Sequence, residues 1–155
     1  MKKTTRKGDD GKTQLNGKTV DKTSKEIKII GLIDELQAII AIARQETQMK
    51  ELDELKKFCY EAMAYINGNN ISIKGWIEKF DKICEKEIEA NGFINPSGKS
   101  SYINLARTKA REIEIAILEG YGPCDLSIAF NRLSDVLFVY AYEYQRDEGA
   151  LRFFK

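Results

Sequence analysis

Apolar residues recur at every third or fourth position through most of this 155-residue chain. This spacing places side chains on one face of an α-helix, whereas a half-buried strand needs strict alternation, which no segment clearly shows. The pattern occupies five stretches, at residues 29–43, 52–66, 73–88, 106–117 and 126–140. The sequence therefore predicts five amphipathic helices and an all-α fold.

Turn-forming residues separate the predicted helices. Asn67-Gly68-Asn69-Asn70 and Asn91-Gly92 bound the third helix, and segments with glycine and proline precede the fourth and the fifth. Short linkers join antiparallel neighbours, so we expect an up-down bundle. We expect a single domain over residues 1–155, with an irregular arm at 1–23, the helical bundle at 24–147 and a tail at 148–155.

Positive charge is concentrated near the N-terminus. Residues 1–28 hold nine Lys/Arg and four Asp/Glu, a net charge of +5, while the other residues, with 16 basic and 20 acidic side chains, carry −4. Gly8 and Gly11 allow backbone N–H groups to converge beside Lys7 and Lys12, as a polyphosphate site requires. Each Gly-Lys-Thr or Gly-Lys-Ser tripeptide in the chain lacks the earlier glycine that a P-loop requires, so a P-loop NTPase is not predicted. From its composition alone, the N-terminal segment could equally be a solvated tail.

Residue counts exclude other classes of site. The chain has no histidine, which removes imidazole as a general base and as a zinc ligand. Cys59, Cys84 and Cys124 are odd in number and form no close pair, which argues against a disulfide framework. The overall charge of +1 argues against a nucleic-acid coat, and no apolar run approaches the roughly 20 residues of a membrane span. Polar residues, not a secretory core, follow the basic N-terminus, so we expect a cytoplasmic protein with no membrane or nucleic-acid partner.

Polar side chains share faces of the last two predicted helices. Arg107, Arg111 and Glu114 are spaced by four and three residues, so two guanidinium groups could clamp phosphates or bridge a neighbouring carboxylate. The alternative is an ordinary charged face on which Glu114 balances Arg111. On the next helix, Asn131 and Asp135 could read a sugar or a base, or Asp135 could simply pair with the neighbouring Arg132.

Asp34 and Phe93 stand out by position. Asp34 lies mid-helix between two predicted core residues, where an acid usually has a cationic partner, and Arg107 is the candidate. Phe93 lies alone on the linker before Pro96. An aromatic ring on such a loop most often covers the core, and the alternative is a ring presented to a flat ligand.

Five motifs, in order along nearly the whole chain, resemble those of the PduO-type ATP:corrinoid adenosyltransferases. They are Thr5-Arg6-Lys7-Gly8-Asp9-Asp10-Gly11-Lys12-Thr13, Gly31-Leu32-Ile33-Asp34-Glu35-Leu36, Phe93-Ile94-Asn95-Pro96-Ser97-Gly98, Ala106 to Glu114, and Asn131 to Asp135. Each motif is weak alone, but the ordered set is specific. The resemblance implies a ferritin-like five-helix bundle that assembles as a homotrimer.

The resemblance also implies roles for individual residues. ATP would bind between subunits under the arm, with Mg²⁺ carried by the triphosphate rather than by protein side chains. The ATP-binding residues would be Thr5, Arg6, Lys7, Gly8, Asp9, Gly11, Thr13, Lys22, Arg111, Glu114 and Asn131. Asp34 and Arg107 would form an ion pair between subunits, and Phe93 and Asp135 would contact the corrinoid. The catalytic set would be Arg111, Phe93, Asp34 and Arg107.

The implied reaction is attack by cob(I)alamin on the 5′-carbon of ATP, which releases triphosphate and forms adenosylcobalamin. Phe93 against the lower face of the corrin would expel the axial ligand and ease reduction of Co(II). Arg111 and Lys7 would stabilise the leaving triphosphate. The resemblance leaves open a reductase partner that supplies Co(I).

The chain departs from the family pattern at five positions, one of which is Glu112, where the family has a second arginine after the one at Arg111. Ser97 replaces a glycine, and Glu26, Lys28 and Ile30 stand where the family has arginine, an acid and tyrosine. These departures keep a second function in consideration, a trimeric bundle that binds ATP or corrinoid without transfer. A third is a plain interaction bundle with a basic tail.

Overall fold

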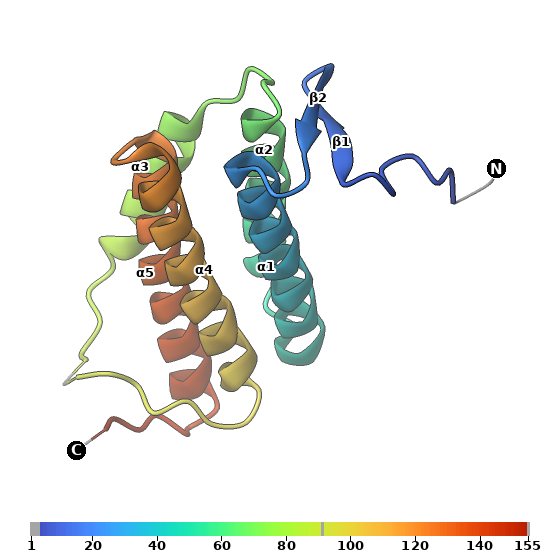
Figure 1. The fold of residues 1–155 in the computed structure, drawn as a ribbon. Coiled ribbons are helices and arrows are strands. Elements are labelled where there is room, and N and C mark those ends of the chain that lie inside the picture. Colours follow the sequence, from blue (N-terminus) through green and yellow to red (C-terminus); the bar gives the residue numbers. More distant parts are fainter. Residues whose placement is uncertain (1–3, 91, 155) are drawn as a thin grey trace.

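Five helices form the bundle in this computed structural model, which describes residues 4–90 and 92–154 (Figure 1). They are α1 (Lys25–Thr47), α2 (Leu52–Ile66), α3 (Ile73–Cys84), α4 (Ser100–Tyr121) and α5 (Asp125–Asp147). α1 packs against α2 and α4, and α5 packs against α3 and α4. The predicted all-α, five-helix bundle is confirmed.

The apolar stripes read from the sequence form the core. Ile33, Leu36 and Ile40 of α1 are fully buried, as are Ile113 of α4 and Leu133 of α5. Burial of these faces supplies the main free energy that holds the helices together. α1 is also apolar away from the core, where Ile42 is 48% exposed.

An aromatic cluster joins α2, α3 and α5. The ring of Phe58 lies 5.4 Å from Trp76, 5.0 Å from Phe80 and 5.1 Å from Phe130, between ring centroids. The indole Nε1–H of Trp76 donates to Glu61 Oε2 at 2.6 Å, so the polar edge of the only tryptophan is satisfied. The cluster is part of the core and holds the short helix α3 to the rest of the bundle.

The arm is not irregular throughout, and this part of the prediction is wrong. Strands β1 (Lys12–Leu15) and β2 (Lys18–Asp21) pair antiparallel. Their turn is Asn16-Gly17, with φ of 48° and 71°, and two positive φ angles are what a two-residue hairpin of this twist requires. An Asn-Gly turn is a hairpin signal, but strands of four residues are too short for alternation to stand out.

Helix α3 ends at Cys84, earlier than the predicted run to Ile88. Ile88 is the only large apolar residue between Cys84 and Gly92, so a further helical turn would bury little surface. The Lys86 ammonium instead pairs with Glu143 of α5 at 3.0 Å. The chain then crosses to α4 through an extended segment that borders the candidate site. Among the described residues, no helix combines the length and apolar character of a membrane span.

Candidate functional site

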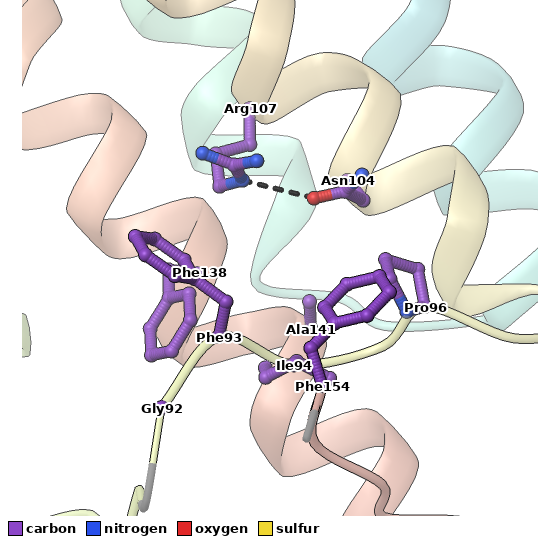
Figure 2. A pocket seen from close by; sticks show the side chains of 9 residues that line it. All are labelled: Gly92, Phe93, Ile94, Pro96, Asn104, Arg107, Phe138, Ala141 and Phe154. Atoms are coloured by element: carbon purple, nitrogen blue, oxygen red, sulfur yellow. Dashed lines mark hydrogen bonds between the residues drawn. The ribbon is translucent and has the colours of Figure 1, made fainter.

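A hollow of about 660 Å³ opens between α4, α5, the segment before α4 and the C-terminal segment. Figure 2 shows the nine residues that line it, with Arg107 above and the rings of Phe93, Phe138 and Phe154 around it. A second hollow of about 630 Å³ shares Gly92, Phe93, Arg107 and Phe138 with the first and adds Arg111, Ser134 and Asp135. The two are therefore parts of one large surface, with aromatic walls and two arginines at its border.

Phe93 presents its ring to this hollow. Its side chain is 71% exposed, so the interpretation of Phe93 as a cover for the core is wrong. The neighbouring Ile94, only 6% exposed, points into the core instead, because successive side chains of an extended backbone alternate. The Phe93 carbonyl accepts a hydrogen bond from the Phe154 N–H at 3.1 Å, which joins the loop to the C-terminal segment.

Arg107 and Asp34 are not brought together within one chain. The Arg107 guanidinium donates from Nε to Asn104 Oδ1 at 2.9 Å on its own helix (Figure 2). Asp34 is exposed and lines a separate hollow of about 510 Å³ between α1 and α2, beside Lys56 and Lys57. The two charges lie on surfaces built from different helix pairs.

Arg111, Glu114 and Asn131 do come together. Arg111 Nη1 lies 3.2 Å from Glu114 Oε2 and donates to Asn131 Oδ1 at 3.4 Å across the α4–α5 contact. Glu114 is only 14% exposed, whereas Arg111 is 51% exposed. The largely buried Glu114 carboxylate thus lies beside one terminal nitrogen of an exposed guanidinium, an arrangement suited to an anionic ligand.

Asp135 faces the hollow and has no bond to Arg132. Arg132 donates from Nε to Asp81 Oδ1 of α3 at 2.7 Å, so the alternative pairing of Asp135 with Arg132 is wrong. Cys84 lies close to this group. Desolvation, with the charge of Asp135 second, raises the pKa of the Cys84 thiol to about 11 and keeps it protonated at neutral pH.

The arm forms its own polar hollow of about 640 Å³. It is lined by Lys7, Gly8, Asp10, Lys12, Thr13, Gln14 and Thr19. A Cβ on Gly8, whose φ is +93°, would lie 2.8 Å from the Lys12 carbonyl oxygen and 3.1 Å from Lys22 Nζ. Glycine is therefore needed where the loop passes under the Lys22 ammonium.

Hydrogen bonds fix the positions of three other arm residues, Lys12, Thr5 and Lys22. Lys12 pairs with Asp21 at 2.9 Å, and this hydrogen bond raises the pKa of Lys12. Thr5 Oγ1 accepts from the Lys7 N–H at 3.3 Å, and the Lys22 N–H donates to the Gly11 carbonyl at 2.8 Å. The side chains of Arg6 and Asp9 are exposed.

The arm hollow and the Arg111 group are built from different elements, the first from the hairpin and the residues before it and the second from α4 and α5. Figure 1 shows the hairpin beside the ends of α1 and α2, with the residues before it extending away on the side opposite α5. The Asn16 N–H donates to Asn67 Oδ1 at 2.8 Å and ties the hairpin to the end of α2. The predicted site residues therefore form two separate groups within one chain.

Phe154 and Asn104 also line the hollow, although the sequence pattern did not single out either residue. Phe154 is 61% exposed and stands across the hollow from Phe93. The adjacent pair Phe153-Phe154 could have indicated a lining residue. In an extended segment, successive side chains point to opposite faces, so one ring of such a pair is buried and the other is exposed. Asn104 lies three residues before Arg107, a spacing that places both on one helical face.

The fold and the hollow together define a helical-bundle protein with an aromatic, arginine-bordered site for a large ligand. A family model described as "Cobalamin adenosyltransferase" matches residues 3–144. A cobalamin adenosyltransferase of Cupriavidus metallidurans is 30% identical over 94% of this chain and 89% of its own length. The chain belongs to the cobalamin adenosyltransferase family.

Solved structures share the fold. A variant of the PduO-type ATP:corrinoid adenosyltransferase from Lactobacillus reuteri, complexed with cobalamin and ATP, has a TM-score of 0.78 at 22% identity, covering 97% of this chain and 94% of that one. Another variant of the same enzyme, complexed with ATP, has a TM-score of 0.79 at 23% identity, covering 98% and 99%. The helical architecture thus extends over almost the full length of both chains.

Proposed function

We propose that this member of the cobalamin adenosyltransferase family transfers the 5′-deoxyadenosyl group of ATP to the cobalt of a reduced corrinoid and releases triphosphate. The observation that carries the proposal is the exposed ring of Phe93 over a hollow that Arg107 and Arg111 border. An exposed aromatic ring on a loop whose backbone is hydrogen-bonded in place suits a flat, largely apolar substrate such as a corrin.

Phe93 would act on cobalt by keeping axial ligands away from it. A phenyl ring against the lower face of the corrin would exclude an axial ligand and offer no donor atom in return, which eases reduction of Co(II) to Co(I). The chain has no histidine that could replace that ligand. Asp135, at the edge of the same hollow, would contact the polar periphery of the corrinoid.

ATP would bind where the arm of one subunit meets the Arg111 group of another. The arm would contribute Thr5, Arg6, Lys7, Gly8, Asp9, Gly11, Thr13 and Lys22, and the helices Arg111, Glu114 and Asn131. Arg111 and Lys7 would stabilise the charge that develops on the leaving triphosphate. The separation of the two groups in one chain supports a site shared between subunits.

Mg²⁺ would be carried by the triphosphate. Two of the three carboxylates of the arm are engaged within it, since Asp21 pairs with Lys12 and Asp10 Oδ1 accepts from the Lys12 N–H at 3.1 Å, while Asp9 is exposed. This arrangement fits a metal held by phosphate oxygens. The ion would neutralise charge on the triphosphate, and the chain's own cations would complete that task.

The assembly would be a homotrimer in which Asp34 of one subunit pairs with Arg107 of the next. Neither Asp34 nor Arg107 has an ion-pair partner among the residues that the structure describes. Leu105 and Ile115 of α4 are each about half exposed, at 50% and 51%. Apolar side chains of this kind on a helix face favour subunit contact. The whole chain would work as one domain, with the arm at 1–23 and the tail at 148–155 both serving the site.

The working location would be the cytoplasm, with an electron-donating reductase as a transient partner. Cys59, Cys84 and Cys124 are free thiols, which suits a reducing compartment. Cob(II)alamin needs one electron before transfer, and the reductase would supply it.

The decisive experiment incubates the protein with cob(I)alamin and Mg-ATP. Light-sensitive alkylcobalamin in the visible spectrum, with one triphosphate released for each product, is the expected result. Binding of ATP and corrinoid without product would favour a non-catalytic binding protein instead. Binding of neither ligand would leave a plain interaction bundle.

A further inference from the structure

Gln145 is a buried polar residue in the last turn of α5 that the proposed chemistry does not use. Its side chain is 1% exposed. Its Oε1 accepts from Ser100 Oγ at 2.7 Å, and its Nε2 donates to the carbonyls of Asn95 and Ala150, each at 3.2 Å. One amide therefore bonds three segments, two of which lie about 50 residues earlier in the chain.

The three segments are the start of α4, the loop that carries Phe93 and the C-terminal segment. Ser100 Oγ also accepts from the Ser97 N–H at 3.1 Å, which fastens the end of the loop. Its single hydroxyl proton lies between two acceptors, Gln145 Oε1 and the Ser97 carbonyl oxygen, the latter 2.8 Å away. The bonds of Gln145 thus hold the loop both at Asn95 and, through Ser100, at Ser97.

The loop and the C-terminal segment pair with each other next to these bonds. Ile94 and Phe153 form an antiparallel bridge, the Asn95 N–H donates to the Arg152 carbonyl at 2.8 Å, and the Phe154 N–H donates to the Phe93 carbonyl. This short pairing carries Phe93 on one strand and Phe154 on the other. Gln145 bonds both strands, at Asn95 and at Ala150.

The two rings on this pairing have little packing of their own. Phe93 is 71% exposed and Phe154 is 61% exposed, so contacts of the rings with the protein cannot fix their places. Their positions must follow from the backbone to which they are attached. That backbone is anchored in the core by Ile94 and by the amide of Gln145.

We propose that Gln145 is a positioning residue for adenosyl transfer, which sets Phe93 and Phe154 at the hollow without touching the substrates. The proposal rests on the proposed function. A buried amide is suited to this role because it accepts one bond and donates two, and all three are made here. Methionine has a similar volume but would leave both carbonyls and the Ser100 hydroxyl without this partner.

The test compares Gln145→Met with Ser127→Ala. Ser127 is also buried, and it makes the same reciprocal bonds at the start of α5, with Cys124, that Ser100 makes with Ser97. It therefore controls for the loss of a buried hydrogen-bonding group elsewhere in the bundle. Ser100→Ala is the second test variant, since it removes one of the three bonds and leaves the Gln145 donors in place.

Each protein is assayed by two routes, with cob(II)alamin plus reduced flavin as the one-electron donor and with chemically prepared cob(I)alamin. A 1 Å displacement in a site can cost about a hundredfold in rate, so we expect Gln145→Met to slow the cob(II)alamin route roughly ten- to a hundredfold. We expect a clearly smaller effect on the cob(I)alamin route, a raised KM for corrinoid and an unchanged KM for ATP. Ser100→Ala should change the two rates and the KM for corrinoid in the same direction but by less, and Ser127→Ala should change none of them.

Amide hydrogen exchange gives a readout that does not depend on activity. The N–H groups of Asn95 and Phe154 should lose protection in Gln145→Met and keep it in Ser127→Ala. Unchanged protection, or equal slowing of both routes together with a raised KM for ATP, would overturn the positioning role. If Gln145→Met does not fold, the same criteria apply to Ser100→Ala. Wild-type protein that makes no alkylcobalamin from cob(I)alamin would instead refute the proposed function, and the exchange result would still decide the role of Gln145.

Discussion

Arg107 and Arg111 lie one helical turn apart on α4 but are held differently. Arg107 is half-buried and its Nε is bonded to Asn104, whereas Arg111 is 51% exposed between Glu114 and Asn131. A guanidinium that is exposed yet oriented by a carboxylate can meet an anion with little loss of side-chain entropy. The two arginines should therefore respond differently to substitution.

Arg111→Ala should abolish most of the transfer while leaving the assembly intact. Loss of a group that stabilises charge in the transition state costs about a hundred- to a thousandfold in kcat. The measurement is kcat with cob(I)alamin, with sedimentation to follow the oligomer. Arg146→Ala, which removes an equally exposed arginine paired with Asp147, is the control and should keep its activity. A tenfold or smaller loss in Arg111→Ala would contradict the role in catalysis.

Phe93→Ala should separate the two routes to product. Because the ring is mostly exposed, its removal costs the fold little, and ATP affinity should not change. The rate from cob(II)alamin should fall far more than the rate from chemically supplied cob(I)alamin, since only reduction needs the axial ligand excluded. Phe93→Leu keeps an apolar side chain, so its rate from cob(II)alamin should lie between those of Phe93→Ala and the wild type. Equal rates for Phe93→Ala and wild type on both routes would remove Phe93 from the mechanism.

At the level of elements, the β1–β2 hairpin organises the arm. Pairing of Lys12 with Asp21 in register brings the Gly8–Gly11 turn under Lys22, whose N–H bonds the Gly11 carbonyl. The hairpin touches the bundle through Asn16 and Asn67. Its stability is therefore largely its own, and an isolated two-stranded hairpin is marginal in water.

Gly17→Ala should weaken ATP binding without weakening the bundle. A Cβ at Gly17 would meet nothing within 4 Å, so the substitution acts only through its φ of +71°, at a cost of about 1 kcal/mol. A smaller folded fraction of the arm should raise the KM for ATP about fivefold. Gly149→Ala imposes similar strain, at φ +66°, far from the arm and should leave this KM unchanged. An unchanged KM in Gly17→Ala would show that the hairpin does not support the ATP site.

At the level of the whole molecule, the proposed trimer requires Asp34 of each subunit to pair with Arg107 of the next. Asp34→Ala or Arg107→Ala should each weaken assembly by about 2–5 kcal/mol, because a desolvated charge loses its partner. The double exchange Asp34→Arg with Arg107→Asp should recover much of that loss. Sedimentation over a range of concentrations measures both effects. Single variants that assemble as wild type does would exclude the ion pair from the interface.

Alkaline pH should destabilise the fold through its buried proton donors. Burial raises the pKa of the Cys59 thiol from 9.0 to about 12, and burial, with Glu51 second, raises the pKa of Tyr140 from 10.0 to about 12. The folded state therefore retains protons that the unfolded chain releases. The stabilisation is complete below pH 9 and is lost as pH rises toward 12.

Denaturant unfolding followed by the fluorescence of Trp76 measures this loss. The free energy of unfolding should fall as pH rises from about 9 to 12 in the wild type. In Cys59→Ala the fall should be shallower, because one of the buried proton donors is gone while Tyr140 remains. The same slope in both proteins would show that Cys59 does not contribute.

The helices could be read from the sequence because each signal is local. The stripes through Ile33, Leu36 and Ile40 or through Ala110 and Ile113 need only the 3.6-residue period of a helix and the tendency of apolar side chains to be buried. The end of α3 was misplaced because Ile88 continues the helical spacing and packs against the core, although the helix itself has ended at Cys84. The hairpin was missed because its pattern is only four residues long on each side.

The candidate site depends on contacts between segments that are distant in sequence. Arg111 and Glu114 share a face by spacing alone, but their approach to Asn131 requires α4 to pack on α5. Whether Phe93 covers the core or faces solvent depended on Ile94 and on the C-terminal segment, which lies about 60 residues further along the chain.

The sequence by itself determined the five amphipathic helices, the cationic glycine-rich arm and the absence of imidazole chemistry, since these follow from residue types and short spacings. Only the tertiary structure decided that Phe93 is presented to a hollow, that Phe154 stands across from it and that Gln145 bonds both of their strands. The physical reason is that a side chain's exposure and hydrogen-bond partners are set by whichever distant segment packs beside it, and no local pattern records that segment.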